Sequence, residues 1–237
     1  MDEAITFISF TRLLIIFIPS GIVLFMMYSW SLEWKNSSYA IGRMLGQLII
    51  TGYCLSYIFN SNSSLLILCI LMSMVVVASW IALRILNKQR INLLRHAFIA
   101  ITLGGGIILF IVTQILLQLD PWYMPRFMVP LAGMIFSSAM NGISLAAERL
   151  QAEIDKGIRY DEARRIAFKA SLIPTINSLF AVGVVSLPGM MTGQILSGIS
   201  PLTAARYQIM VMCMIFNSVG LASYIFLVLL KPKSIKK

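Results

Sequence analysis

The sequence has 237 residues, of which 59 % are hydrophobic and only 12 % are charged, and its mean hydropathy is +0.87. This apolar share exceeds the roughly 45–50 % that is typical of soluble globular domains, which excludes that class. The formal net charge is +10, but the basic residues stand at the ends of apolar runs and not in a patch with aromatic residues, so nucleic acid is excluded as a partner.

Long apolar runs fill most of the chain. A spanning helix needs about 20 mainly apolar residues, and the length admits seven such segments with little room for anything else. We therefore predict an all-α integral membrane protein in which residues 1–237 form a single transmembrane domain in the lipid bilayer. The predicted spans are 4–28, 40–59, 64–86, 97–117, 127–147, 170–187 and 204–230.

Small residues mark two of these spans. Gly104, Gly105 and Gly106 lie within the span 97–117 and are predicted to weaken or bend it. In the span 127–147, small residues recur at four-residue spacing, as Ser138 and Gly142 illustrate. That spacing lets another helix approach closely, so we interpret this face as one of helix packing.

The distribution of lysine and arginine predicts the orientation. Seven spans place the links near 29–39 and 84–95, the segment 148–169 and the C-terminus on one side, and nearly all basic residues fall there. Arg12, Arg126 and Arg206 are the exceptions. Because cytoplasmic loops carry the excess of basic residues, we expect the N-terminus outside and the C-terminus inside a multi-pass protein of the plasma (inner) membrane.

The segment 148–169 is the one long charged stretch, and its pattern predicts a cytoplasmic hairpin of two helices. Arg149 and Glu153 have the spacing of helical ion pairs, and Gly157 is a natural helix C-cap. Asp161 and Glu162 suit the start of a second helix. Two interpretations remain open on pattern alone: a solvated connector between spans, or a docking element for a cytoplasmic partner.

The second unusual stretch is 182–208, which lacks acidic residues and is interrupted by glycine and proline. Helix is expected to break at Pro188 and Gly189, giving an extracytoplasmic loop over 188–203. Irregular backbone at membrane depth is tolerated only where it is buried in protein or lines a watery cavity. The loop is either a long turn between spans or a gate that faces the substrate.

Residues 187–211 (LPGMMTGQILSGISPLTAARYQIMV) resemble the signature of the FetB-type permease family of ATP-binding-cassette (ABC) transporters, which includes plant aluminium-tolerance half-transporters. A match of this length is far more specific than a short motif, and residues 174–178 (PTINS) extend it. The resemblance implies a membrane permease subunit that exports a metal ion, iron in particular. It also implies a homodimer energised by a separate cytoplasmic ABC ATPase, so that ATP is used by the partner.

The resemblance directs attention to two sets of residues. The first set is expected at the substrate pathway or gate, and it consists of Asn177, Pro188, Gly189, Met190, Met191, Thr192, Gly193, Gln194, Gly198, Pro201, Tyr207, Gln208 and, more distantly, Gln47. Within this set, the backbone geometry is expected to come from Pro188, Gly189, Gly193 and Gly198. Those expected to dock the ATPase are Arg149, Glu153, Gly157, Tyr160, Glu162 and Ala163.

Several chemistries find no support in the sequence. No G-x-x-x-x-G-K-[ST] loop is present, so the chain is not expected to hydrolyse ATP by that route or to act as an enzyme. His96 is the one histidine, no covalently bound cofactor is expected, and no metal-ligand set is defined. Met190 and Met191 suit a soft metal but are more often packing residues. The alternatives to a permease are a membrane scaffold or sensor and an ATP-independent channel or carrier.

Overall fold

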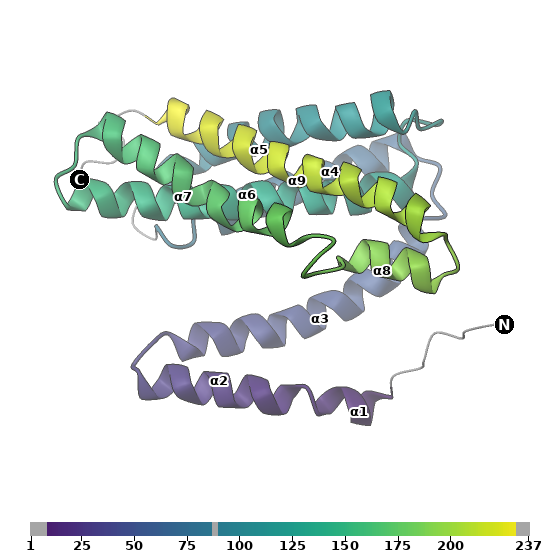
Figure 1. The fold of residues 1–237 in the computed structure, drawn as a ribbon, viewed down its shortest axis with the longest axis horizontal. Coiled ribbons are helices and arrows are strands. Elements are labelled where there is room, and N and C mark those ends of the chain that lie inside the picture. The colour runs from purple at the N-terminus through teal and green to yellow at the C-terminus, as the bar shows by residue number, and fades with distance from the viewer. Residues whose placement is uncertain (1–8, 87–89, 231–237) are drawn as a thin grey trace. The chain divides into compact units, whose positions relative to one another are not determined.

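The computed structural model describes residues 9–86 and 90–230, and every regular element in that part of the chain is helical. The chain divides into two compact units, Met1–Ser61 and Asn62–Lys237. The elements, labelled in Figure 1, are α1 (Phe10–Leu14), α2 (Phe17–Ser29), α3 (Trp34–Ile58), α4 (Ser64–Ala82), α5 (Arg90–Phe110), the π-helical η1 (Ile111–Leu116), α6 (Pro125–Asp155), α7 (Tyr160–Ala181), α8 (Gly189–Leu196) and α9 (Pro201–Leu229).

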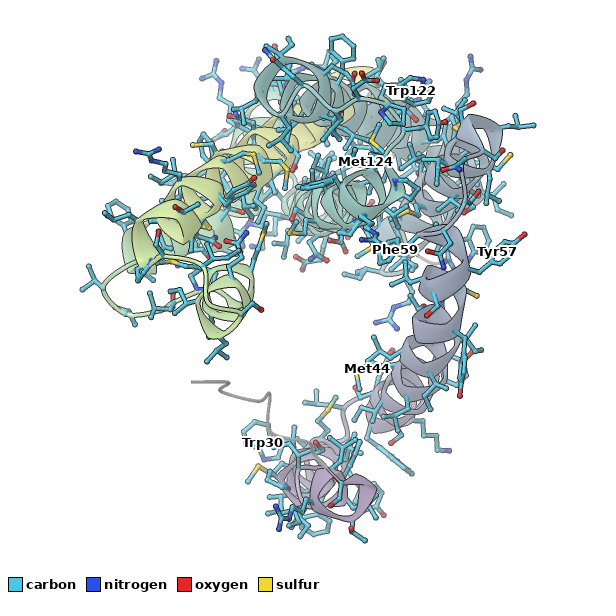
Figure 2. The ribbon with its side chains drawn as sticks, turned by 90° about the vertical axis from the view of Figure 1, so that its right-hand side faces the viewer. Trp30, Met44, Tyr57, Phe59, Trp122 and Met124 are labelled. Carbon is cyan, nitrogen blue, oxygen red and sulfur yellow. The ribbon has the colours of Figure 1, made fainter. Side chains whose placement is uncertain are left out.

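The first unit consists of α1, α2 and α3. The rings of Tyr28 and Trp34 meet edge to face, 5.8 Å apart, at the turn that reverses the chain between α2 and α3. Neither of these two helices contains a buried residue, and Met44 and Tyr57 project outward from α3 (Figure 2). An apolar surface of this kind fits helices that are surrounded by lipid or by other helices.

The second unit is a helical bundle with α6 and α9 at its centre. Helix α9 packs against α5, α6 and α7, whereas α6 also contacts α4. The short helix α8 lies beside the start of α9, at one end of the bundle (Figure 1). The fully buried side chains of this core include Ile101, Ile135, Ile143, Met214 and Phe226.

Glycines set the closest approaches between these helices. A Cβ atom on Gly104 of α5 would lie 2.6 Å from the main-chain nitrogen of Ala222 in α9, and one on Gly105 would lie 2.9 Å from the ring of Phe136 in α6. Helix α5 continues through all three glycines. Gly104 and Gly105 thus serve contact between helices, and they do not end the helix.

Five helical segments within residues 9–86 and 90–230 are long and apolar enough to cross a membrane: Thr11–Ser29, Ser64–Ala82, Arg90–Leu116, Pro125–Asp155 and Pro201–Leu229. Helices α3 and α7 cover most of the other two predicted spans, 40–59 and 170–187, but they are not among these long apolar segments. In α7 the reason is its charged first half, which contains Asp161, Glu162, Arg164, Arg165 and Lys169.

Several helix ends differ from the predicted span ends, because turn-forming residues end these helices and not the limits of the apolar runs. Helices α6 and α7 run without interruption into the charged hairpin and turn only at 156–159. Helix α7 ends at Ala181, earlier than the predicted Leu187, and residues 189–196 of the predicted loop are helical. Trp122, which is labelled in Figure 2, pairs edge to face with Tyr123, 5.6 Å away, in the link before α6.

Candidate functional site: a polar cavity between α6, α7 and α9

A cavity of about 380 Å³ lies within the second unit, between α6, α7, α9 and the loop that precedes α8. The polar side chains that line it are hydroxyls and one amide, and none of its lining residues carries a formal charge. These polar residues are Ser138, Asn141, Ser171, Thr175, Ser178 and Ser186. The cavity can therefore donate and accept hydrogen bonds, but it offers no compensating charge to an ion.

Helical periodicity explains how α7 supplies half of these groups. Ser171, Thr175 and Ser178 are spaced at i, i+4 and i+7, which places them on one face of a helix. Pro174 lies on the same face and cannot donate a main-chain hydrogen bond within α7. The hydroxyl of Ser178 donates to the Pro174 carbonyl at 3.0 Å, so part of the polar face is satisfied within the helix.

Close packing of α6 on α9 shapes the opposite wall. A Cβ atom on Gly142 would lie 2.7 Å from the Ser223 hydroxyl oxygen and 2.9 Å from Val219 Cγ1. This confirms that the small-residue face of α6 is a packing face at Gly142. Ser138, which belongs to the same four-residue series, instead lines the cavity.

Four of the lining residues have unused hydrogen-bonding capacity. The side chains of Ser138, Asn141, Thr175 and Ser186 make no hydrogen bond to any residue in the described part of the chain. Asn141 and Ser186 are exposed in this unit, and Ser138 and Thr175 are half-buried. In a bilayer, which offers no water to satisfy such groups, unpaired polar atoms are costly. A water-filled or solute-binding cavity resolves that cost.

A second, apolar cavity of about 320 Å³ adjoins the first, and Val182 and Met212 line both. Met191 of α8 and Gln208 and Cys213 of α9 contribute to its wall. Gln208 is only 4 % exposed, and its amide oxygen has no hydrogen-bond partner within residues 9–86 and 90–230.

The backbone of the signature segment is set by two glycines in the left-handed conformation. Helix α7 ends in a type II turn, in which Gly183 has φ of +84° and Val184 N–H donates to the Ala181 carbonyl at 3.3 Å. Helix α8 ends in a Schellman motif at Gly198, with φ of +86°. There the N–H groups of Gly198 and Ile199 donate to the carbonyls of Ile195 and Gln194, each at 3.0 Å.

The glycines therefore differ from expectation. Gly198 has the special conformation that was predicted for it, whereas Gly189 and Gly193 lie in helix α8 with open space around them and without positive φ. The chain breaks at Gly183, before Pro188, because the sequence Val182-Gly183-Val184-Val185 combines a left-handed residue with β-branched neighbours that favour extended backbone. Pro188 instead occupies the N-cap position of α8.

The remaining gate candidates are divided between the cavities and the surface. Pro188 lines the polar cavity, and Met191 and Gln208 line the apolar one. The hydroxyl of Thr192 donates to the carbonyls of Leu187 and Pro188, whereas Gln194 has an unpartnered buried amide oxygen among the described residues. Those that line neither cavity are Thr192, Gln194, Asn177 (exposed, on α7), Met190, Pro201 (the first residue of α9) and Tyr207.

Gln47 stands apart from these residues because it belongs to the first unit. It is exposed on α3, one turn after Arg43. Its amide oxygen can accept hydrogen bonds from Arg43 Nε at 3.2 Å and from Nη2 at 3.3 Å. This local pairing accounts for its polarity.

The hairpin between α6 and α7 has the helix–turn–helix form that the pattern predicts. Gly157 has φ of +83° and closes a Schellman motif, with its own N–H and that of Ile158 bonded to the carbonyls of Ile154 and Glu153. Glu153 is 5 % exposed, and its carboxylate pairs with Arg149 at 2.8 Å and with Lys156 at 3.3 Å.

The docking candidates are only partly accessible in this unit. Arg149, Gly157 and Glu162 are exposed, whereas Glu153 and Ala163 are buried in the bundle. The Tyr160 hydroxyl is turned toward the end of α9, where it donates to the carbonyls of Leu227 and Leu230. Glu153, Ala163 and Tyr160 thus hold the hairpin in place. Arg149, Gly157 and Glu162 are the candidates available to a partner.

The hydroxyl-lined face of α7 and Asn141 of α6 are absent from the expected gate residues. The available signal was the i, i+4, i+7 recurrence of Ser171, Thr175 and Ser178, which is easily overlooked because serine and threonine commonly back-bond within spans. No group of three or more His, Cys, Asp or Glu residues able to hold a metal occurs in residues 9–86 and 90–230.

Comparison with known proteins gives consistent matches. The chain matches the family described as "Uncharacterised protein family (UPF0014)" over residues 10–160 and 158–235. It is 36 % identical over 205 residues to UPF0014 membrane protein slr1647 of Synechocystis, covering 78 % of this chain and 79 % of that one. It is 34 % identical over 206 residues to the "Probable iron export permease protein FetB" of Escherichia coli, with coverage of 81 % and 78 %.

A plant relative is also similar. The chain is 31 % identical over 203 residues to "Protein ALUMINUM SENSITIVE 3" of Arabidopsis thaliana, covering 78 % of this chain and 72 % of the relative. No solved structure matches the chain.

Proposed function

The chain belongs to the UPF0014 family of membrane proteins, and we propose that it is the permease subunit of an ABC-type exporter that carries a metal across the plasma membrane. Two copies form the pathway, and two copies of a separate ATPase supply the energy. The name of the Escherichia coli relative supports iron as the metal.

The observation that carries this proposal is the continuity of α7. One unbroken helix, Tyr160–Ala181, bears the docking candidate Glu162 near its start and the cavity residues Ser171, Thr175 and Ser178 further along. The helix remains continuous across Pro174, which removes one main-chain hydrogen bond, and we infer that a displacement of the charged hairpin is transmitted along it to the wall of the cavity. The same helix ends at the turn that leads into Pro188 and α8.

The proposed topology has seven spans, with the N-terminus outside and the C-terminus inside. The polar character of α7 fits this topology, because a helix that lines a cavity within protein needs less apolar surface than one that faces lipid. In this arrangement Gly157 and Glu162 of the hairpin lie in the cytoplasm. Asp120, in the link before α6, lies on the opposite side.

Capture of the ATPase tests the proposal. The full-length protein is solubilised in detergent from its native membrane, and co-purifying proteins are identified by mass spectrometry. We expect a stoichiometric P-loop ATPase to co-purify with the wild type and with Asp120→Lys, and to be lost with Glu162→Lys. Both substitutions reverse one exposed acidic charge. Only Glu162 lies on the proposed cytoplasmic side, so Asp120→Lys controls for the charge change itself.

Two results would contradict the proposal. Recovery of the wild type without any ATPase, under conditions that retain other transporter complexes, would favour a scaffold or an ATP-independent channel. Equal retention by both variants would place the docking surface elsewhere than the hairpin.

A further inference from the structure

We propose that the solute passes the polar cavity as a charge-compensated species, that is, a metal wrapped in organic oxygen ligands with little net charge, and not as a bare divalent cation. This inference rests on the proposed transport function. It concerns the chemical form in which the metal is carried.

The donor set of the cavity argues against a bare cation. Protein sites for iron and similar metals use carboxylate, imidazole or thiolate ligands, which supply negative charge or strong donation. The polar cavity offers hydroxyls, one amide and the thioether of Met212. The adjoining cavity adds the amide of Gln208, the thioether of Met191 and the thiol of Cys213, but no carboxylate and no imidazole.

The cost of removing a cation from water makes the lack of charged ligands a strong argument against a bare cation. Moving a small ion of charge two from water into a site between helices is strongly unfavourable unless opposite charge accompanies it. No formal charge is available on the side chains of Ser138, Asn141 and Thr175 or of the other lining residues. A metal whose charge is neutralised by its own ligands avoids this cost.

The hydrogen-bonding capacity of the cavity suits the outer surface of such a complex. Ser138 and Asn141 come from α6, Thr175 from α7 and Ser186 from the loop, and all four side chains lack partners in the described part of the chain. Each can donate to ligand oxygens, and each can also accept. Because these groups come from three elements, they can contact several atoms of a polyatomic solute.

The size of the cavity leads to the same conclusion. Metal ions are held by a tight shell of ligands at roughly 2.0–2.6 Å, whereas pockets for small organic molecules are typically about 300–1,000 Å³. The polar cavity, at about 380 Å³, lies within the second range. It is therefore large enough for a ligand shell as well as an ion.

Equilibrium binding of radioactive iron to the purified full-length protein tests the inference. Two probes are compared: ferrous ion kept reduced without chelator, and the neutral ferric complex with three maltolate ligands. The variants are Asn141→Asp, which adds one negative charge at nearly constant size, and Thr175→Val, which removes a hydroxyl at constant shape. Asn217→Asp, at an exposed position of α9 that lines neither cavity, is the matched control.

We expect the neutral complex to bind the wild type and Asn217→Asp equally, and to bind Asn141→Asp and Thr175→Val at least tenfold more weakly. Ferrous ion should bind none of the four. Binding of ferrous ion to the wild type, tightened tenfold by Asn141→Asp, would overturn the inference. So would binding of neither probe to the wild type.

Failure of this inference is distinguishable from failure of the proposed function. If the ATPase is captured but the neutral complex does not bind, the permease proposal stands and the form of the solute is wrong. If no ATPase is captured, the permease proposal fails whatever the probes do. Thr175→Val keeps the experiment decisive if Asn141→Asp does not fold, since it introduces no charge.

Discussion

The hydroxyl of Tyr160 donates a hydrogen bond to the carbonyl of Leu230 at 2.5 Å and a longer one to the carbonyl of Leu227 at 3.3 Å. The last carbonyls of a helix lack partners within the helix itself, so this side chain caps the end of α9. It also ties the first residue of α7 to the helix that forms the other wall of the cavity. The hairpin and α9 are thereby connected at the end proposed to face the cytoplasm.

Replacing Tyr160 with phenylalanine should loosen that connection. The change removes the hydroxyl and its hydrogen bonds to these two carbonyls, and it is expected to cost about 1 kcal/mol of unfolding free energy. Thermal unfolding of the purified protein in detergent measures the loss. Tyr207→Phe, which removes a hydroxyl from a side chain outside both cavities, is the control and should leave the unfolding temperature unchanged.

The contribution of Tyr160 should also depend on pH. Burial raises the pKa of its phenol above the ordinary value, while the nearby Arg164 lowers the pKa and Asp161 raises it. A group whose pKa is raised in the folded state stabilises the protein fully below its unfolded pKa, near 10, and loses that effect as pH rises through the folded value.

The difference in stability between the wild type and Tyr160→Phe should therefore be constant from about pH 7 to 9 and decrease above about pH 10. A series of unfolding measurements across this range gives the result. A difference that grows with pH would contradict the assigned burial of the phenol.

Gly104→Ala and Gly106→Ala form a matched pair in the same helix. A methyl group at Gly104 would meet the backbone of Ala222, so α5 and α9 must separate, and overpacking of this kind costs about 1–3 kcal/mol. Gly106 has nothing within 4 Å, so its replacement should be neutral or stabilising by up to about 1 kcal/mol. Unfolding temperatures of the two variants provide the measurement, and equal values would refute the close approach.

Gly183→Ala and Gly189→Ala distinguish the two glycines at the ends of the turn before α8. Gly183 has a positive φ, so alanine is strained there by about 1–2 kcal/mol, whereas Gly189 is helical and unobstructed. If the turn sets the position of Pro188, transport of iron into inverted membrane vesicles should fall with Gly183→Ala and persist with Gly189→Ala. Western blotting of the membranes checks that both variants insert equally.

Much of the helical architecture was predictable because its signals are local. Apolar runs of about 20 residues located helices near every predicted span, and the Gly157 cap with Asp161 and Glu162 behind it predicted the helix–turn–helix of the hairpin. The ion pair between Arg149 and Glu153 follows from their four-residue spacing. None of these predictions requires knowledge of a distant contact.

The helix end before Pro188 was misplaced although its signal is also local. Both Gly183 and Gly189 are permitted to adopt positive φ, and the sequence does not say which one does so. The decision depends on whether the valines around Gly183 extend the chain or continue the helix. In the structure the type II turn forms at Gly183, and the helix that follows uses Gly189 as an ordinary helical residue.

By itself the sequence determined that this is an all-helical membrane protein with a charged hairpin and a signature segment, because hydropathy, charge and caps act within a few residues of the chain. Only the tertiary structure decided which polar groups meet. Asn141 and Thr175 are 34 positions apart along the sequence, and they line one cavity because Gly142 lets α9 pack closely against α6 while α7 folds back beside both. Such proximity depends on the packing of side chains across helices, which no local pattern encodes.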